Sequence, residues 1–317
     1  MNRRDYMRVA ISLAILCASA VICSPATALA WGLEGHAIIG AAAMAHLPAD
    51  VPDFLKAPAA QAEIAYLNAE EDRLKIDEDV DRAWYRQWST DHYLDVTDDG
   101  SVGGSIRLSD LPATRDDFIK TLWTGSHPVD PYDVGFLPYA ILEGYQQVRA
   151  DFGLWRMATT PQERAWRAQL TVHDIGMFAH FVGDGSQPLH VSVHFNGWGD
   201  FPNPNGYSQS RTLHADFETG FVDRYADAHA VTALVAPAQT FDAVPLSAIE
   251  RYLGATNVQL APLYQLEKRG GFALTDSTSS IHLEAVRFTD ARLAAAATML
   301  DSLIETAWRT SAQIHNG

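Results

Sequence analysis

Four possible metal ligands occur as two pairs with the same spacing, and this repeat constrains the fold more than any other feature of the sequence. His180 and Asp184 stand four residues apart, and so do His214 and Glu218. Residues four apart share one face of an α-helix. Between the pairs lies His190, two residues after a proline that would end or bend the first helix. Imidazole and carboxylate groups on facing helices can bind metal ions, so the spacing predicts a helical metal site.

The alternative is that these residues are polar groups on the solvent side of ordinary helices. That interpretation would be preferred for any single pair. The whole set, however, falls within one stretch, 173–218, among apolar neighbours that include Phe178, Phe181, Val182 and Leu189. This concentration favours a metal-binding role for the stretch.

The N-terminus has the features of an export signal. A basic start with Arg3 and Arg4 leads into the apolar run 9–23, and Ala28-Leu29-Ala30 fits a small-residue cleavage site. We predict a signal peptide over 1–30 and a single catalytic domain over 31–317, located in the periplasm or secreted. A membrane anchor is less favoured because the apolar run is short. Both the general secretory route and the twin-arginine route fit the adjacent arginines.

Composition adds two expectations. Both cysteines, Cys17 and Cys23, lie inside the predicted signal, so the mature chain would have no disulfide and bound metal ions could stabilise it instead. The formal net charge is −16, so the chain has no general basic surface for nucleic acid. Metal ions would neutralise part of that charge, so it argues only weakly against a phosphate-bearing substrate.

Helical periodicity dominates the remainder of the chain, and alternating strand patterns are rare. We therefore predict an all-α fold in a single, mostly helical domain. The segments expected to be helical are 36–47, 51–75, 114–122, 137–157, 161–182, 213–229, 246–267 and 278–312. The stretch 101–134 is rich in glycine and proline and is expected to be largely loop.

Four separate motifs follow one another in the chain: WGLEGH directly after the predicted cleavage site, HYLD, HFVGDGSQPLH and LHADFE. In this order they resemble the motifs of the zinc-dependent phospholipase C / S1-P1 nuclease superfamily. The resemblance covers about 31–218, and the C-terminal third adds only a compatible helical pattern. It implies an all-α enzyme that holds a trinuclear zinc cluster between its helices and hydrolyses phosphoester bonds.

The resemblance also implies which residues bind the three zinc ions. The first would be bound by the amino nitrogen and carbonyl oxygen of Trp31 with His36 and Asp184. The second would be bound by His92, His180 and Asp184 with one acidic residue from 68–72, and the third by His190, His214 and Glu218. The role of Trp31 requires cleavage immediately before it, because only a free amino group can bind metal together with the carbonyl oxygen.

Three departures leave the assignment open. The block NAEEDRLK stands where the nucleases usually have WADxxR, so the acidic ligand is uncertain among Glu70, Glu71 and Asp72. We select Asp72, which is followed by a basic residue. Glu218 matches the bacterial phospholipases C, whereas the short spacing from Trp31 to His36 matches the nucleases.

The resemblance implies hydrolysis by a metal-activated water. Asp72 would orient that water, and Arg73 would offset charge on the phosphate. Tyr93 and Asp95 are expected to bind substrate. Our first expectation is an S1/P1-type nuclease on single-stranded DNA or RNA, with 3′-nucleotidase activity as an extension. The alternative is a phospholipase C acting on phosphatidylcholine-like head groups. No protein partner is implied and a monomer is expected.

Two further histidines are assigned supporting roles. His173 lies seven residues before His180, on roughly the same helical face, and is interpreted as a residue that supports the metal ligands or packs near them. His194 is close to His190 in the chain and is expected to support it by a hydrogen bond.

Overall fold

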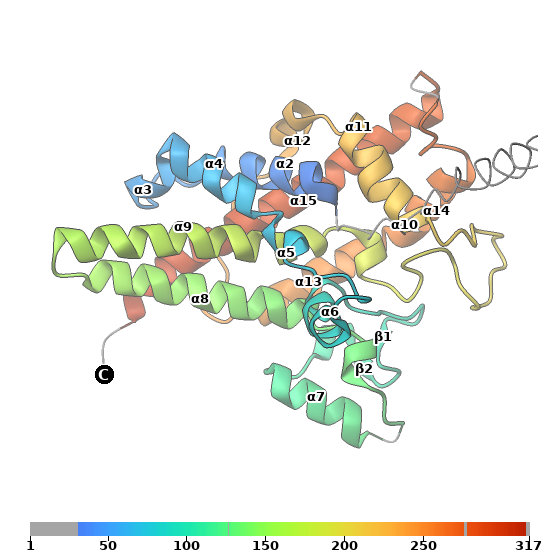
Figure 1. The fold of residues 1–317 in the computed structure, drawn as a ribbon, viewed down its shortest axis with the longest axis horizontal. Coiled ribbons are helices and arrows are strands. Elements are labelled where there is room, and N and C mark those ends of the chain that lie inside the picture. Colours follow the sequence, from blue (N-terminus) through green and yellow to red (C-terminus); the bar gives the residue numbers. More distant parts are fainter. Residues whose placement is uncertain (1–30, 126, 276–277, 315–317) are drawn as a thin grey trace, which may run out of the picture.

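The computed structural model describes residues 31–125, 127–275 and 278–314, so the predicted signal and both cysteines lie outside the described residues. Within these ranges the chain is mostly helical (Figure 1). The longer helices are α2 (Gly32–Met44), α4 (Pro58–Leu67), α6 (Arg82–Ser89), α7 (Arg115–Thr124), α8 (Leu137–Met157), α9 (Pro161–Asp184), α13 (Leu246–Asn257), α14 (Leu260–Lys268) and α15 (Ser280–Thr310). The short ones are α3 (Asp53–Lys56), α5 (Glu70–Arg73), α10 (Leu213–Ala215), α11 (Asp223–Tyr225) and α12 (Ala228–Leu234).

Shorter turns of helix connect these elements. They are η1 (Thr90–His92), η2 (Leu108–Asp110), η3 (Pro131–Asp133), η4 (Pro188–His190), the π-helical η5 (Asp216–Val222) and η6 (Ser311–Gln313). The described strands are β1 (Ser101–Val102) and β2 (Ile106–Arg107), which pair antiparallel. The predicted all-α class is confirmed.

Helix α9 is the central element and runs side by side with α8 (Figure 1). Its start is defined by Pro161 in the first turn and by Thr160, whose side chain accepts a hydrogen bond from the backbone N–H of Glu163. Its other faces pack against α4, α5 and α15. Because α9 is covered on several sides, its last two turns, with His180 and Asp184, are buried.

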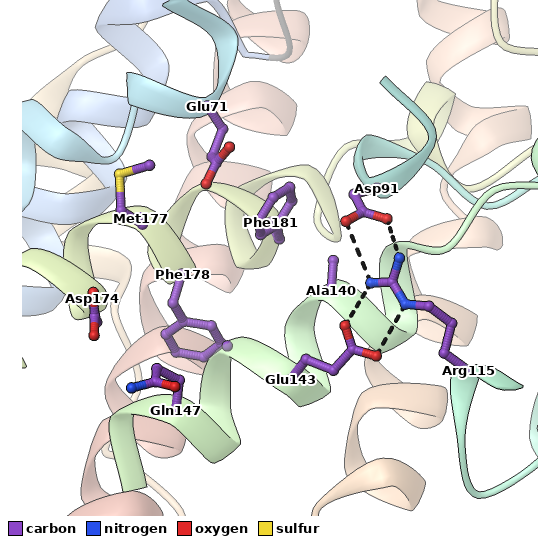
Figure 2. Close-up of a pocket in the computed structure, with 11 residues that line it drawn as sticks. Glu71, Asp91, Arg115, Ala140, Glu143, Gln147, Asp174, Met177, Phe178 and Phe181 are labelled. Atoms are coloured by element: carbon purple, nitrogen blue, oxygen red, sulfur yellow. Dashed lines mark hydrogen bonds and ion pairs between the residues drawn. The ribbon is translucent and has the colours of Figure 1, made fainter. Parts of the chain in front are cut away.

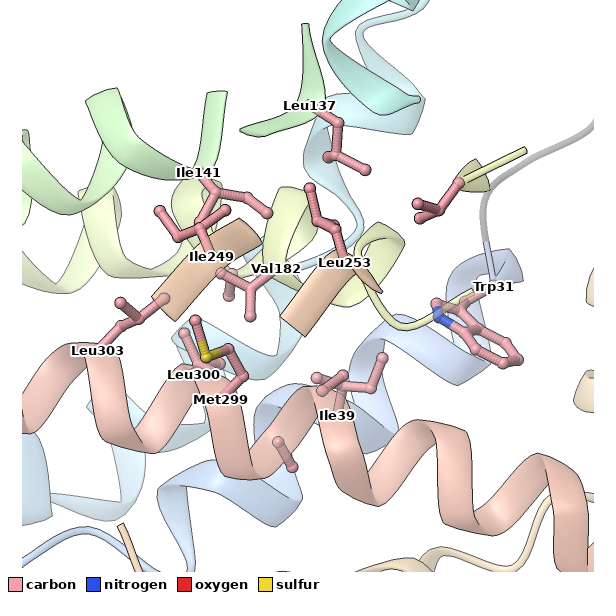
Figure 3. Close-up of a cluster of buried hydrophobic side chains, with 14 of the residues drawn as sticks. Trp31, Ile39, Leu137, Ile141, Val182, Ile249, Leu253, Met299, Leu300 and Leu303 are labelled. Carbon is pink, nitrogen blue, oxygen red and sulfur yellow. The ribbon is translucent and has the colours of Figure 1, made fainter. Parts of the chain in front are cut away.

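A core of aliphatic side chains fixes the end of α9 that carries these residues. Figure 3 shows Val182 of α9 among Ile249 and Leu253 of α13 and Leu300 and Leu303 of α15. All five are fully buried. Burying a large aliphatic side chain contributes about 1.5–3 kcal/mol. The core therefore holds α9 rigidly next to the polar cluster described below.

The main differences from the sequence-based expectation lie in polar segments. The stretch expected at 51–75 is divided into α3, α4 and α5, and the one at 246–267 is interrupted between α13 and α14. The aromatic-rich segment after residue 81 forms α6, capped by Asp81, which accepts a hydrogen bond from the backbone N–H of Trp84. None of the helices in the described part of the chain is both long and apolar enough to cross a membrane.

Candidate metal centre

Three groups of buried histidine and carboxylate side chains converge at the end of α9. In each group the candidate ligand atoms lie within 4.8 Å of one another. The groups are His36, His180 and Asp184; Asp72, His92 and His180; and His190, His214 and Glu218. The structure thus brings together the side chains that the sequence analysis selected as metal ligands.

Each histidine of the cluster uses its Nδ1 atom to contact an oxygen that can only accept. The Nδ1 of His180 donates to the backbone oxygen of Asn68 at 2.8 Å, and that of His92 to the backbone oxygen of Trp88 at 3.0 Å. The remaining three contacts are from His36 to the Asn68 side-chain oxygen, from His190 to the His92 carbonyl and from His214 to the Phe195 carbonyl. A ring that donates from Nδ1 presents the lone pair of Nε2 to a metal.

The atoms that point into the cluster lack hydrogen-bond partners. Within the first two groups these are Nε2 of His36, His92 and His180 and both carboxylate oxygens of Asp72 and Asp184. Buried polar atoms are almost always paired, so such a concentration calls for a missing partner. The unprotonated nitrogens and the carboxylate oxygens can all only accept. A cation can therefore satisfy them, whereas another side chain without a hydrogen-bond donor cannot.

Asp184 is placed to serve two of the groups. One carboxylate oxygen lies 3.4 Å from Nε2 of His36 and the other lies 3.4 Å from Nε2 of His180. A side chain at Gly183 would come within 2.9 Å of the His36 ring, so glycine permits α2 and α9 to approach this closely. A carboxylate with two free oxygens between two imidazoles can bridge two metal ions.

Burial governs the protonation of this part of the cluster. It lowers the pKa of His36 to about 4 and lowers the pKa of His92 and His180 well below the usual value. Burial also raises the pKa of Asp184 and of Asp72. The three imidazoles are therefore neutral at pH 7, which is the form that binds a metal.

The third group is assembled from η4 and the π-helical segment. The Oε1 atom of Glu218 lies 3.0 Å from Nε2 of His190 and 2.8 Å from Nε2 of His214. Burial alone would raise the pKa of Glu218, but the adjacent His214 and His190 outweigh burial and lower it. Gln187 also donates to the same oxygen. Single π-helical turns occur frequently at functional sites, and here one carries Glu218.

Trp31 is fixed against the ligand-bearing end of α9. Its side chain is fully buried, and the indole N–H donates to the Gly183 carbonyl at 2.8 Å and to the Ser186 hydroxyl at 3.1 Å. The residue has a φ of 42°, in the left-handed region. The indole thus holds the start of α2 beside the first group. Chelation of a metal through the amino nitrogen and carbonyl oxygen of Trp31 stays a prediction.

Of the three acidic candidates in 70–72, the structure brings Asp72 to the cluster. Its Oδ1 lies 3.9 Å from Nε2 of His92 and 4.0 Å from Nε2 of His180. Glu70 instead pairs with Arg73 at 2.8 Å. Glu71 lines a separate pocket, together with Arg115 (Figure 2).

A cleft of about 490 Å³ opens onto the cluster. Its lining includes the ligands His92, His190 and His214 and the predicted substrate-binding residues Tyr93 and Asp95. It also includes the polar or charged Lys75, Ser89, Asp133 and Asn196 and the apolar or aromatic Tyr85, Leu189 and Phe195. Burial, followed by repulsion from Asp133, raises the pKa of Asp95 to about 7.

Arg73 does not reach this cleft, contrary to the role expected from the sequence. Its guanidinium donates to Glu70 and to the Tyr66 carbonyl and lies over the Tyr66 ring. The basic residue in the cleft is Lys75, whose ammonium lies 3.9 Å from the Asp72 carboxylate. The sequence did contain an indication of this role for Lys75. The WADxxR pattern has its basic residue three positions after the Asp, and Lys75 lies three positions after Asp72.

The spacing of the ligands in the sequence did not predict two supporting residues, Asn68 and Gln187. Asn68 is fully buried, and its side chain donates to the His36 carbonyl at 2.7 Å as well as accepting from the His36 ring. Gln187 donates to Glu218 and accepts from the backbone N–H of Leu189. Both act by orienting a ligand, and such a role depends on contacts between distant parts of the chain.

The histidines given supporting roles from the sequence behave differently. The side chain of His173 is 54% exposed and pairs with Asp174, so it does not pack near the ligands. The ring of His194 bonds to Asp98 and to the Trp198 carbonyl rather than to His190. The shared helical face misled for His173, and proximity in sequence misled for His194.

Comparison with known proteins gives structural neighbours only. No protein-family model matches the chain, and no match was found among curated proteins. Among solved structures the chain is similar to the alpha toxin of Clostridium absonum, with 12% identity, a TM-score of 0.43 and 86% of this chain covered. It is also similar to the alpha-toxin of an avian strain of Clostridium perfringens, with 14% identity, a TM-score of 0.39 and 89% covered. The matches cover 64% and 65% of the toxin chains.

Proposed function

We propose that this chain is a zinc-dependent phosphoric ester hydrolase that holds three zinc ions. The observation that carries the proposal is the convergence of three adjoining ligand groups, in the first two of which the Nε2 and carboxylate oxygen atoms have no partner. Mixed imidazole and carboxylate sets suit zinc. Zinc ions held there would activate water and offset negative charge on phosphate oxygens.

The chain's own residues would orient the substrate. The cluster opens into the cleft through His92, His190 and His214, so a phosphate group entering it would meet the ligands from that side. Lys75 stands at the same opening and would donate from its ammonium to a phosphate oxygen. Asp72 lies within reach of Lys75 and would hold that ammonium in place.

A substrate with a cationic head group fits the outer part of the cleft best. Asp95 and Asp133 supply carboxylates there, and Tyr85, Tyr93 and Phe195 supply aromatic rings. Aromatic rings and carboxylates together bind quaternary ammonium groups. The net charge of −16 would also oppose the approach of a long polyanion. These features favour a phospholipase C activity on phosphatidylcholine-like lipids.

Single-stranded nucleic acid is the second candidate. The Phe195 ring is 50% exposed at the cleft and could stack on a base, as aromatic residues do in proteins that bind single strands. Asp95 could then accept a hydrogen bond from the amino group of the base. An S1/P1-type nuclease, with 3′-nucleotidase activity, remains the expectation from the sequence motifs.

The test compares three substrates with the zinc-loaded chain. These are phosphatidylcholine vesicles, denatured DNA and a small chromogenic phosphodiester, each with and without chelator. The proposal predicts chelator-sensitive hydrolysis of the small ester and faster turnover of the vesicles than of DNA. Asp95→Asn should raise KM for the lipid, whereas Asp53→Asn, a 99% exposed carboxylate on α3, should leave it unchanged. Failure to hydrolyse all three would contradict the proposed class.

Export also belongs to this proposal. Cleavage before Trp31 would release a periplasmic or secreted monomer whose new amino group would serve as a ligand of the first group. Sequencing the N-terminus of the exported chain tests the cleavage site, and a mature chain that begins anywhere else would contradict it.

A further inference from the structure

His194 is a fully buried histidine outside the metal centre, and both of its ring nitrogens face oxygen atoms. Nδ1 lies 2.8 Å from the Trp198 carbonyl, and Nε2 lies 2.9 Å from the carboxylate of Asp98. A carbonyl and a carboxylate can only accept hydrogen bonds. Both contacts are therefore hydrogen bonds only when the ring carries a proton on each nitrogen, that is, when it is an imidazolium.

The surroundings of the ring favour that positive charge. The Trp198 indole stacks on the His194 ring with centroids 3.8 Å apart and an angle of 13° between the planes. An aromatic face stabilises a cation placed over it. The carboxylate of Asp98, 62% exposed, completes an ion pair whose imidazolium is buried and whose carboxylate still reaches water.

The ring joins two segments that are far apart in the chain. Asp98 belongs to the turn before β1, which also bonds to the chain next to His194 through the backbone N–H of Val193 and the Val96 carbonyl. Trp198 belongs to the loop 195–212, which separates His190 from His214. The two hydrogen bonds of His194 therefore fasten this loop to the turn.

The fastened loop is also what holds His214. The Phe195 carbonyl accepts a hydrogen bond from Nδ1 of His214 at 2.9 Å, and the Asn196 side chain accepts one from its backbone N–H at 3.3 Å. Phe195 and Asn196 directly follow His194 in the chain. A shift of His194 would thus be passed to the orientation of the His214 ring, and hence to the third group.

Other titratable groups packed around the ring come from two elements. Tyr264 of α14 donates its hydroxyl to the His194 carbonyl at 2.7 Å, and Tyr207 at the far end of the loop packs against Trp198 and Tyr264. Burial raises the pKa of Tyr264, so it stays neutral. Asp98 is the charged group that faces the ring.

We propose that His194 is a positioning residue: its doubly protonated ring donates from both nitrogens, fastens the loop 195–212 to the turn at Asp98 and thereby holds His214. The link from His214 to metal binding rests on the proposed function, whereas the protonation state and the fastening of the loop do not.

Asp98→Asn separates protonation from shape. Its amide can donate to the unprotonated Nε2 of a neutral ring while Nδ1 still donates to Trp198, so both contacts persist without the charge. Asp98 is largely exposed, and the asparagine has the same size. Asp53→Asn serves as the matched control, because it also removes one exposed carboxylate but at α3.

The ring nitrogens of ¹⁵N-histidine-labelled holoprotein provide the first measurement. In the wild type and in Asp53→Asn, both His194 ring nitrogens should carry protons, whereas Asp98→Asn should show a neutral ring. Amide exchange in 195–212 should be the same in these three proteins, because both ring contacts persist in each. It should be faster in His194→Phe, which keeps a ring but lacks both hydrogen bonds.

Metal affinity provides the second measurement. The weakest-bound zinc of His194→Phe should bind roughly 10-fold more weakly than that of the wild type, the effect expected when the support of a ligand is weakened. Its affinity in Asp98→Asn should equal that of the wild type. A neutral His194 ring in the wild type, or loop exchange in His194→Phe equal to that of the wild type, would overturn the proposal. If the ring and the loop behave as described but no metal is bound, the proposed function fails instead.

Discussion

Replacing Asn68 with alanine tests how the chain orients its first group of ligands. The substitution removes the hydrogen bond from the Asn68 amide to the His36 carbonyl and the one from the His36 ring to the Asn68 oxygen. It keeps the Asn68 backbone oxygen, which holds the His180 ring. The change should therefore weaken metal binding at His36 while leaving the other two groups formed.

The magnitude follows from those two contacts. Loss of the residue that orients a metal-bound histidine typically costs 10–100-fold in metal affinity, about 1.4–2.7 kcal/mol. Two buried hydrogen bonds contribute about 1 kcal/mol each to folding, so the metal-free variant should be about 2 kcal/mol less stable.

The assay is competition for zinc against a chelator of known affinity, followed by measurement of the metal that stays on the protein. Asn68→Ala should release one ion at a chelator concentration about 10–100-fold below that needed for the wild type. Asn203→Ala is the control, since the Asn203 side chain bonds the backbone of Tyr207 and not a cluster residue. Wild-type release from Asn68→Ala would refute the assigned role of Asn68.

Three more predictions concern charge, pH and the chain start. Lys75→Gln should lower kcat about 10²-fold with unchanged zinc content, because it removes a phosphate-facing cation and no ligand; an unchanged kcat would exclude Lys75 from the reaction. Asp301 is fully buried with both oxygens unpaired, and burial, then Glu305, raises its pKa from 3.8 to about 7. The stabilisation from protonated Asp301 is therefore present below about pH 4 and is lost as pH rises through about 7, on the order of 1.4 kcal/mol per pH unit. In urea unfolding, the free energy of unfolding of Asp301→Asn should fall less steeply over this interval than that of the wild type. An equally steep fall in both proteins would contradict this prediction. One extra residue before Trp31 should weaken metal binding at His36, and identical metal content with and without the extension would refute chelation by the terminus.

Local spacing was sufficient to predict part of the centre. His180 and Asp184 lie on one face of α9, as their separation of four residues requires. His214 and Glu218 also meet, even though the chain between them enters a π-helical segment. In both cases the ligands belong to one continuous segment of helix, so sequence distance determines spatial distance.

The residues that the sequence could not place depend on contacts across the fold. Asn68 orients ligands on both α2 and α9, and nothing local to residue 68 indicates that position. Arg73 is the last residue of α5 and Lys75 lies two residues further on, so the two side chains point in different directions. The packing of α5 on α9 decides which of them faces the cleft. His194 was assigned to His190 because the two are close in the chain, whereas its partner Asp98 is 96 residues away.

Metal analysis is the most direct test of whether the three groups of ligands bind metal. The chain that begins at Trp31 would be saturated with zinc, freed of excess metal by gel filtration and analysed for zinc and protein. Three zinc ions per chain are expected, and their removal by chelator should abolish hydrolysis and lower the melting temperature. A saturated chain that retains less than one zinc ion and melts at the same temperature with or without chelator would contradict it.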